Sequence, residues 1–257
     1  MILNPRAPLS GAALALLLST PLAAAESGSF FDPFDRLSQS RWFVSDGWTN
    51  GEHQNCTWAR RALGLTDGVL RLTYIPDPEG QNANLCSEIQ TNAVFSHGTY
   101  EARMKTDHRQ SGFNAAFFTY IGPVHKKPHD EIDFEILTRN TSSVDVNTYV
   151  SGKPQNGRKV ALPTPSDQDF HIYSFTWEPD RLRWYIDGKL MHEATENLPV
   201  TPQKIFFSHW STDRLTEWMG PFMPPAEPVA LEVDWVAFTK AGEPCQFPDS
   251  VLCTAAD

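Results

Sequence analysis

Acidic and large apolar residues alternate along the segment Glu131–Ile136 of this chain. The acids are Glu131, Asp133 and Glu135. Successive side chains of a β-strand point to opposite faces, so the pattern predicts a half-buried strand with one apolar face and one face of carboxylates. Like charges on one strand face repel each other, and a strand with a purely structural role would gain from mixed polar residues there.

The same period of two predicts further strands along the chain. They cover residues 69–74, 100–105, 113–121, 144–150, 170–177, 182–186, 204–210 and 229–238. Glycine-containing turn signals, such as Asp67-Gly68 and Asp187-Gly188, separate several of them. The sequence contains no long amphipathic helix and no repeat of fixed period. Many short strands with little helix predict an all-β fold, a β-sandwich or jelly roll.

The N-terminal segment 1–25 has the features of a secretory signal peptide. Arg6 supplies a positive charge, residues 11–18 form a short apolar core, and Ala23-Ala24-Ala25 offers small residues for cleavage. We therefore predict a secreted protein in which residues 26–257 form a single domain. No later apolar run approaches the roughly 20 residues that a transmembrane helix needs, so we expect no membrane partner.

The net charge of the protein disfavours further classes of binding partner. The formal net charge is −10, which disfavours nucleic acid backbones and anionic membranes as partners. A neutral polysaccharide is compatible with such a surface, and we expect the protein to be a monomer.

Four cysteines in an exported chain favour disulfides, for which three pairings are possible. Cys245 and Cys253 lie close together in the sequence and are predicted to pair locally, which leaves Cys56 with Cys86. A zinc site fits poorly, because the cysteines lack the usual ligand spacing and no histidine pair accompanies them.

Paired carboxyl groups are what cleavage of a glycosidic bond requires. One protonates the leaving oxygen, and the other attacks the sugar carbon or activates a water molecule. Crowding of acids raises the pKa of one of them, which keeps a proton available near neutral pH. The α-carbons of Glu131 and Glu135 would lie roughly 13 Å apart on a straight strand, so a retaining pair needs a curved strand whose side chains lean together. Two alternatives to a catalytic role are open for these acids. They could form the solvent-exposed face of an ordinary strand, or they could bind a hard cation.

The stretch His129–Leu137, with its Glu-x-Asp-x-Glu motif, resembles glycoside hydrolase family 16 and the lichenases (endo-1,3-1,4-β-glucanases) within it. The resemblance covers Phe31–Lys240. It implies a concanavalin-like β-jelly-roll sandwich of two curved antiparallel sheets. It also implies that Glu131 is the nucleophile, Glu135 the general acid/base and Asp133 an assisting carboxylate. These residues would carry out a retaining double displacement on a β-1,3-1,4-linked glucan, with no catalytic cofactor.

Further side chains are expected at a sugar-binding cleft. Most follow from the resemblance and Trp218 from its place in a neighbouring loop: Trp48, Asn50, Glu88, Phe118, Tyr120, Asn147, Tyr149, Trp210 and Trp218. Flat aromatic rings suit the apolar face of a sugar. The alternative for Trp48, Phe118 and Tyr120 is burial in the core. An open cleft predicts endo-acting cleavage, because no chain end is needed.

The resemblance also suggests a structural calcium ion. Its ligands would be the Asp234 carboxylate and the backbone carbonyls of Pro33 and Gly68. The alternative for Asp234 is an ordinary surface acid. The lichenase resemblance also supports the pairing of Cys56 with Cys86.

Three positions depart from the lichenase pattern. Gln90 replaces an arginine, His129 a tryptophan and Ser208 an asparagine. The histidine matches xyloglucan-active members of the family and some bacterial enzymes that cleave exopolysaccharides. The alternatives are thus an endoglycanase acting on a bacterial exopolysaccharide such as succinoglycan, a xyloglucan-type transglycosylase, and a non-catalytic carbohydrate-binding sandwich.

Overall fold

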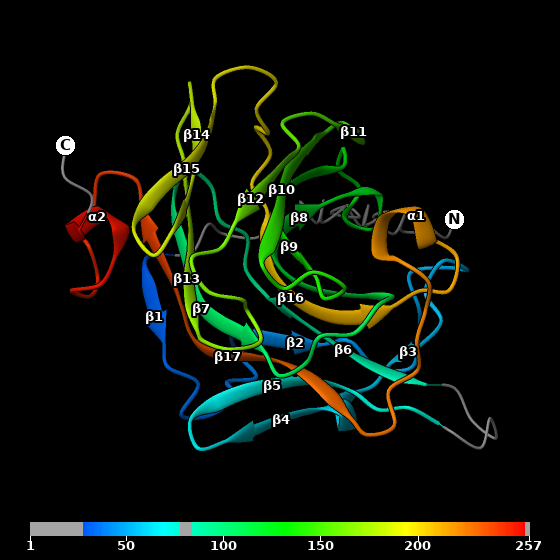
Figure 1. The fold of residues 1–257 in the computed structure, drawn as a ribbon. Helices are drawn as coiled ribbons and strands as arrows, with labels where there is room; N and C mark the ends of the chain where they lie inside the picture. The colour runs from blue at the N-terminus through cyan, green and yellow to red at the C-terminus, as the bar shows by residue number, and fades with distance from the viewer. Residues whose placement is uncertain (1–27, 78–83, 255–257) are drawn as a thin grey trace, which may run out of the picture.

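The computed structural model describes residues 28–77 and 84–254 of the 257-residue chain. The predicted signal peptide and most of the loop 76–85 lie outside these residues. The described chain folds into two antiparallel sheets that pack face to face, with only short helical turns between the strands (Figure 1). The predicted all-β sandwich is confirmed.

One sheet has nine strands and carries the acidic strand near its middle. Its order is β11 (Lys153–Pro154), β10 (Ser143–Val150), β9 (Asp130–Leu137), β8 (Phe113–Ile121), β16 (Lys204–Ser211), β6 (Leu85–Thr91) and β2 (Trp42–Val44). Two short strands lie off this path, with β12 (Arg158–Ala161) on β10 and β3 (Thr57–Trp58) parallel to β6.

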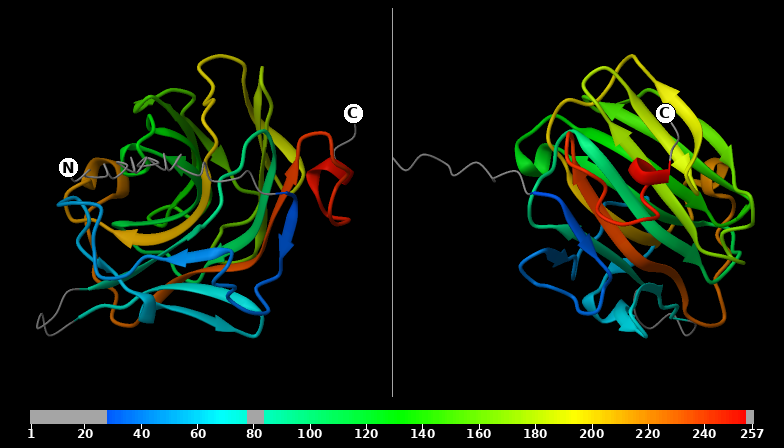
Figure 2. Two further views of the ribbon diagram at one scale, coloured as in Figure 1. Left: turned by 180° about the vertical axis from the view of Figure 1, so that it is seen from behind. Right: turned by 90° about the vertical axis from the view of Figure 1, so that its left-hand side faces the viewer.

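The other sheet has eight strands. Its order is β15 (Lys189–Ala194), β14 (Leu182–Ile186), β13 (His171–Trp177), β7 (Gly98–Thr106), β17 (Val229–Lys240), β5 (Val69–Tyr74) and β4 (Leu63–Thr66), with β1 (Phe30–Asp32) beside β17. The register of β17 shifts between Val233 and Trp235, an irregularity that increases local twist. Figure 2 shows that both sheets curve strongly.

A shared aromatic core joins the sheets. The Phe117 ring of β8 lies 5.1 Å from Phe207 and 6.3 Å from Phe134, centroid to centroid, within the nine-stranded sheet. The same ring lies 5.9 Å from Phe175 of the facing sheet. All four rings are fully buried. Because every second residue of these strands faces this core, the intervening side chains project from the outer face.

The remaining elements are short. They are the 3-10 turns η1 (Arg60–Ala62) and η2 (Pro123–His125) and the helices α1 (Thr216–Met219) and α2 (Val251–Thr254). Cys245 and Cys253 form a disulfide in the segment that ends in α2. This segment lies against the eight-stranded sheet, on the opposite side of the molecule from β9 (Figures 1 and 2). Within the described residues, no helix is long and apolar enough to cross a membrane.

Candidate active site

Strand β9 presents two chemically different faces. Ile132, Phe134 and Ile136 are fully buried in the core between the sheets. The opposite face carries Glu131 and Glu135, and both line a groove of about 720 Å³ on the outer face of the nine-stranded sheet. The alternation of the sequence therefore brings the two acids into one cavity.

Hydrogen-bonded register arranges the outer face in rows that cross the strands. In the first row Tyr149, Glu131, Tyr120 and Lys204 are neighbours on β10, β9, β8 and β16. An aromatic ring thus lies on each side of Glu131, and a lysine follows on the next strand.

The second row passes through the middle acid. Asn147, Asp133, Phe118, Phe206 and Gln90 are successive neighbours on β10, β9, β8, β16 and β6. The Phe118 and Phe206 rings stack with centroids 4.9 Å apart and form part of the groove floor. This floor is flat and apolar, as a pyranose ring requires.

The third row contains two acids separated by small residues. Glu135, Ala116, Ser208 and Glu88 are neighbours on β9, β8, β16 and β6. All four line the groove. Because Ala116 and Ser208 are small, space remains between the carboxyl groups of Glu135 and Glu88.

The surroundings of the acids favour protonated Glu135 and Asp133. Burial raises the pKa of Glu135 to about 8; a hydrogen bond from Asn114 Nδ2 at 2.8 Å opposes this rise and the charge of Glu131 adds to it. Burial, followed by the charges of Glu131 and Glu135, raises the pKa of Asp133 well above its usual range. Asp133 Oδ2 is buried without a hydrogen-bond partner in the described structure.

His129 holds Glu131. The His129 Nε2 atom lies 2.6 Å from Glu131 Oε2. The imidazole ring stacks on Tyr149 with centroids 4.9 Å apart, and it meets Tyr120 edge-on at 5.2 Å. One carboxylate oxygen of Glu131 is thereby fixed, and the other remains available for chemistry.

Glu88 is a third acid of the groove with a displaced pKa. Burial raises its pKa to about 7, against a hydrogen bond from Ser45 Oγ at 2.6 Å. Ser45 precedes the loop that carries Trp48 and Asn50, and both of these residues line the groove. Trp48 is 41% exposed, so it is not a core tryptophan.

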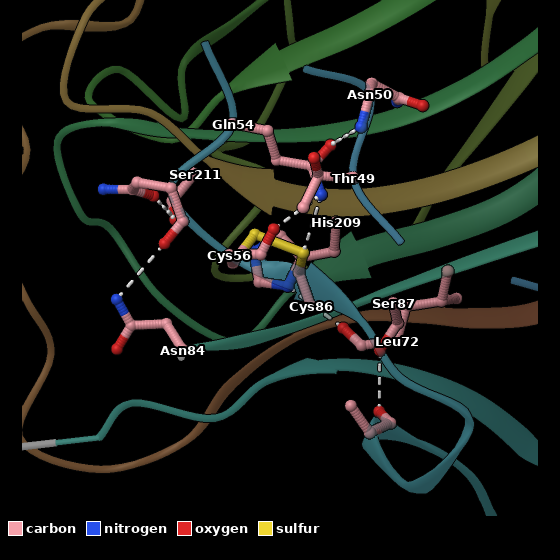
Figure 3. The surroundings of a disulfide bond; sticks show 12 residues. Thr49, Asn50, Gln54, Cys56, Leu72, Asn84, Cys86, Ser87, His209 and Ser211 are labelled. Carbon is pink, nitrogen blue, oxygen red and sulfur yellow. Dashed lines mark hydrogen bonds between the residues drawn. A yellow bond between two sulfur atoms is a disulfide. The ribbon is translucent and has the colours of Figure 1, made fainter. Parts of the chain in front are cut away.

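The disulfide between Cys56 and Cys86 anchors this loop to β6 (Figure 3). Gln54 extends the anchor: its Nε2 donates to the Cys56 carbonyl oxygen at 2.9 Å, and its Oε1 accepts from the Asn50 N–H at 3.1 Å. The position of the groove wall thus depends on a covalent bond beneath it.

We expect replacement of Cys56 and Cys86 by serine to raise KM for a β-glucan several-fold while changing kcat much less. The loop would move, but β9 would keep its acids. The free energy of unfolding should fall by about 2 to 4 kcal/mol, because the bond closes a 30-residue separation. Steady-state kinetics and urea unfolding measure both effects.

The matched control replaces Cys245 and Cys253, whose disulfide lies away from the groove. This variant should lose stability with an unchanged KM. An equal rise of KM in both double variants would contradict the anchoring role.

The structure gathers most of the predicted sugar-binding residues at the groove. Those that line it are Trp48, Asn50, Glu88, Phe118, Tyr120 and Trp210. The other three lie beside it. Asn147 and Tyr149 are the β10 neighbours of Asp133 and Glu131, and the Trp218 ring lies 6.3 Å from Trp210.

Several lining residues were not predicted from the sequence. They are Phe43, Asn92, Ala116, Val124, His125, Lys204 and Phe206. Two of them, Phe206 and Lys204, could have been predicted from the alternation of side chains along β16. Counting back by two from Trp210 along β16 reaches Ser208, then Phe206 and Lys204, which share its face.

The calcium site expected from Asp234, Pro33 and Gly68 stays a prediction. Asp234 Oδ2 pairs with Arg103 Nη1 at 2.6 Å, so an arginine already neutralises this carboxylate. Pro33 follows β1, and Gly68 lies in the turn between β4 and β5. Nowhere in residues 28–77 and 84–254 do three His, Cys, Asp or Glu side chains gather as metal ligands would. Calcium prefers six to eight oxygen ligands, so the Asp234 carboxylate and the backbone carbonyls of Pro33 and Gly68 would need further oxygens to complete such a site.

Comparison with known proteins places this geometry in a family. The endo-1,3-1,4-beta-glycanase ExoK of Rhizobium meliloti (strain 1021) is 52% identical over 227 residues, which cover 88% of this chain and 84% of that protein. The beta-glucanase of Bacillus subtilis (strain 168) is 36% identical, over 90% of this chain and 95% of that protein.

Solved structures agree with the sequence relatives. The structure of Bacillus licheniformis beta-glucanase superimposes with a TM-score of 0.79 at 35% identity and covers 83% of this chain and 99% of that one. The sequence profile of the glycosyl hydrolases family 16 matches residues 50–237, and this stretch includes β9 and every row of the groove described above. The chain is a glycoside hydrolase and belongs to glycosyl hydrolases family 16.

Proposed function

We propose that the protein is a secreted, retaining endo-β-glucanase that cleaves β-1,3-1,4-linked glucan. The observation that carries the proposal is the shared groove of Glu131 and Glu135, with buried Asp133 between them on β9. The relatives named as endo-1,3-1,4-beta-glycanase and beta-glucanase support the substrate class. Residues 1–25 would direct export, residues 26–257 would form the catalytic domain, and a monomer would suffice.

In the first step Glu131 attacks the anomeric carbon of the bound sugar. The bond between this carbon and the glycosidic oxygen breaks while Glu135 delivers its proton to that oxygen, so one half of the chain leaves as an alcohol. The raised pKa of Glu135 keeps this proton in place at neutral pH. His129 holds the second oxygen of Glu131 and orients the attack.

The glycosyl ester then changes the electrostatics of the site. Glu131 loses its charge on esterification, and this charge is one of the causes that raise the pKa of Glu135 and of Asp133. The pKa of Glu135 should therefore fall once the ester has formed. Glu135 can then take a proton from water, and the resulting hydroxide breaks the ester with a second inversion at the same carbon, which gives net retention.

Asp133 has a supporting place in this scheme. It lies buried between the two glutamates on the strand, and this burial, followed by the charges of Glu131 and Glu135, raises its pKa and keeps it protonated. We propose that it donates its hydrogen bond toward Glu131 as the charge there changes. Catalysis would need no cofactor, and calcium is left out of the proposal because Asp234 pairs with Arg103.

The test is digestion of mixed-linkage β-glucan, with product sizes followed by chromatography and the anomeric signal of fresh products by proton NMR. We expect falling viscosity, oligosaccharide products and initial β-anomers. An initial α-anomer would exclude a retaining mechanism. Predominant transfer to an added acceptor sugar would indicate a transglycosylase, and binding without cleavage a carbohydrate-binding sandwich.

A further inference from the structure

Lys204 brings a positive charge into the groove. It lies on the outer face of β16, in the same row as Glu131, with Tyr120 between them. The side chain is half-buried, and its Nζ donates to Gln90 Oε1 at 3.1 Å. Both residues line the groove, so the ammonium group is positioned where substrate passes.

Among the residues that the structure describes, this ammonium group has no anionic partner. In the described parts of the chain it forms no ion pair, although Lys105 and Lys159 pair with Glu232 at 3.2 Å and Asp145 at 2.9 Å. Burial lowers the pKa of Lys204, and no neighbouring carboxylate opposes that shift. A partly buried charge without a counter-charge is unfavourable.

A second basic group lies nearby. His125 of η2 also lines the groove, and its ring contacts Tyr120 at 6.0 Å. Burial lowers the pKa of His125, and the charge of Lys204 lowers it further, so the two groups are close enough to interact. Together they form a basic end of the groove, in which Lys204 carries the positive charge and His125, whose pKa is lowered, offers a ring N–H.

A neutral glucan offers this end only hydroxyl groups. These can accept a hydrogen bond but cannot neutralise a desolvated ammonium group. A carboxylate can do both, and charge-assisted hydrogen bonds are shorter and stronger than neutral ones. The Gln90 amide N–H₂ would supply a second donor beside Lys204, because its oxygen already accepts from the lysine.

We infer that Lys204, with Gln90 and His125, forms a subsite for a carboxylate carried by the polysaccharide. The inference rests on the proposed function and deepens it: the preferred substrate is a β-linked glucan with acidic substituents. A uronic acid, a pyruvate ketal and a succinate half-ester all present this chemistry. A hydroxyl-binding role of Lys204 is the rival explanation.

The experiment compares kcat/KM for a lightly carboxymethylated mixed-linkage β-glucan with kcat/KM for the unmodified glucan. We expect the ratio of the two to fall about tenfold in Lys204→Met and to be retained in Lys204→Arg. High salt should lower the ratio of the wild type, because screening weakens the charge pairing. Glucans bearing succinyl or glucuronyl groups at equal charge then distinguish the source of the carboxylate.

Lys127→Met is the matched control, because Lys127 is an exposed lysine of the neighbouring loop and does not line the groove. Its ratio should equal that of the wild type. An unchanged ratio in Lys204→Met would overturn the inference, and an equal loss on both glucans would indicate hydroxyl binding instead.

Binding provides a readout that does not depend on cleavage. The ratio of Kd values for oligosaccharides of the two glucans is measured in Glu131→Gln, with and without Lys204→Met. If Lys204→Met shifts the Kd ratio while the wild type cleaves neither glucan, the subsite is supported and only the proposed function is contradicted. Equal Kd ratios would count against the subsite alone.

Discussion

Replacement of Glu131 by alanine is expected to lower kcat on mixed-linkage β-glucan by at least about 10⁴-fold, because no other group can form the covalent intermediate. KM should change far less, since the aromatic floor and the loop with Trp48 remain. Steady-state reducing-sugar assays at matched folded concentration measure the loss. Residual activity within tenfold of the wild type would exclude Glu131 as the nucleophile.

Reactions with azide distinguish the role of Glu131 from that of Glu135. In Glu131→Ala the small anion can occupy the vacated space and attack the sugar of an activated aryl glycoside, which gives an α-glycosyl azide. In Glu135→Ala, azide replaces water in the second step and gives the β-product. Exchanged stereochemistry between the two variants would reverse the assignment.

Replacement of Glu135 by glutamine is expected to reduce kcat/KM on β-glucan by about 10³-fold, because the amide cannot protonate the leaving oxygen. On a dinitrophenyl β-glycoside the loss should be much smaller, since that leaving group departs without a proton. Equal losses on both substrates would mean that Glu135 acts in some way other than as the acid.

The pH profile of the wild type reports the same group. Glu135 must be protonated in the first step, and burial raises its pKa to about 8. Therefore kcat/KM on β-glucan should be sustained through neutral pH and fall as the pH rises above about 8. The dinitrophenyl substrate should lack this basic limb, as should the Glu135→Gln variant.

The alternating sequence was enough to predict most long strands and the faces of β9. The predicted strands at 69–74, 113–121 and 182–186 match β5, β8 and β14 at both ends. Strands of two to four residues were not predicted, because so few residues cannot establish a period. The segment Trp42–Val44 is an example, where a single exposed Phe43 between two buried residues contributes to the groove.

Other features of the site depend on which strands become neighbours. The alternation of side chains along β16 predicts that Lys204 faces the groove. Only the register between β16 and β6 shows that Gln90 is its partner. Similarly, the spacing of His129 and Glu131 predicts that they share a face of the strand. It does not by itself predict the hydrogen bond that the structure shows between them. The missing information is the order and register of strands that are distant in the sequence.

The pairing of β1 with β17 has a consequence for biogenesis. Phe30 lies opposite Phe238, so the first described strand completes its hydrogen bonds only with the last strand of the sandwich. Strand β17 also pairs with β5 and β7, and such long-range contacts form late. In the export that we propose, a chain that emerges from a translocation channel with its N-terminus first could not close the eight-stranded sheet until nearly all of it had crossed. Export and maturation would then be coupled in time, with the polypeptide kept open during passage and active only after release.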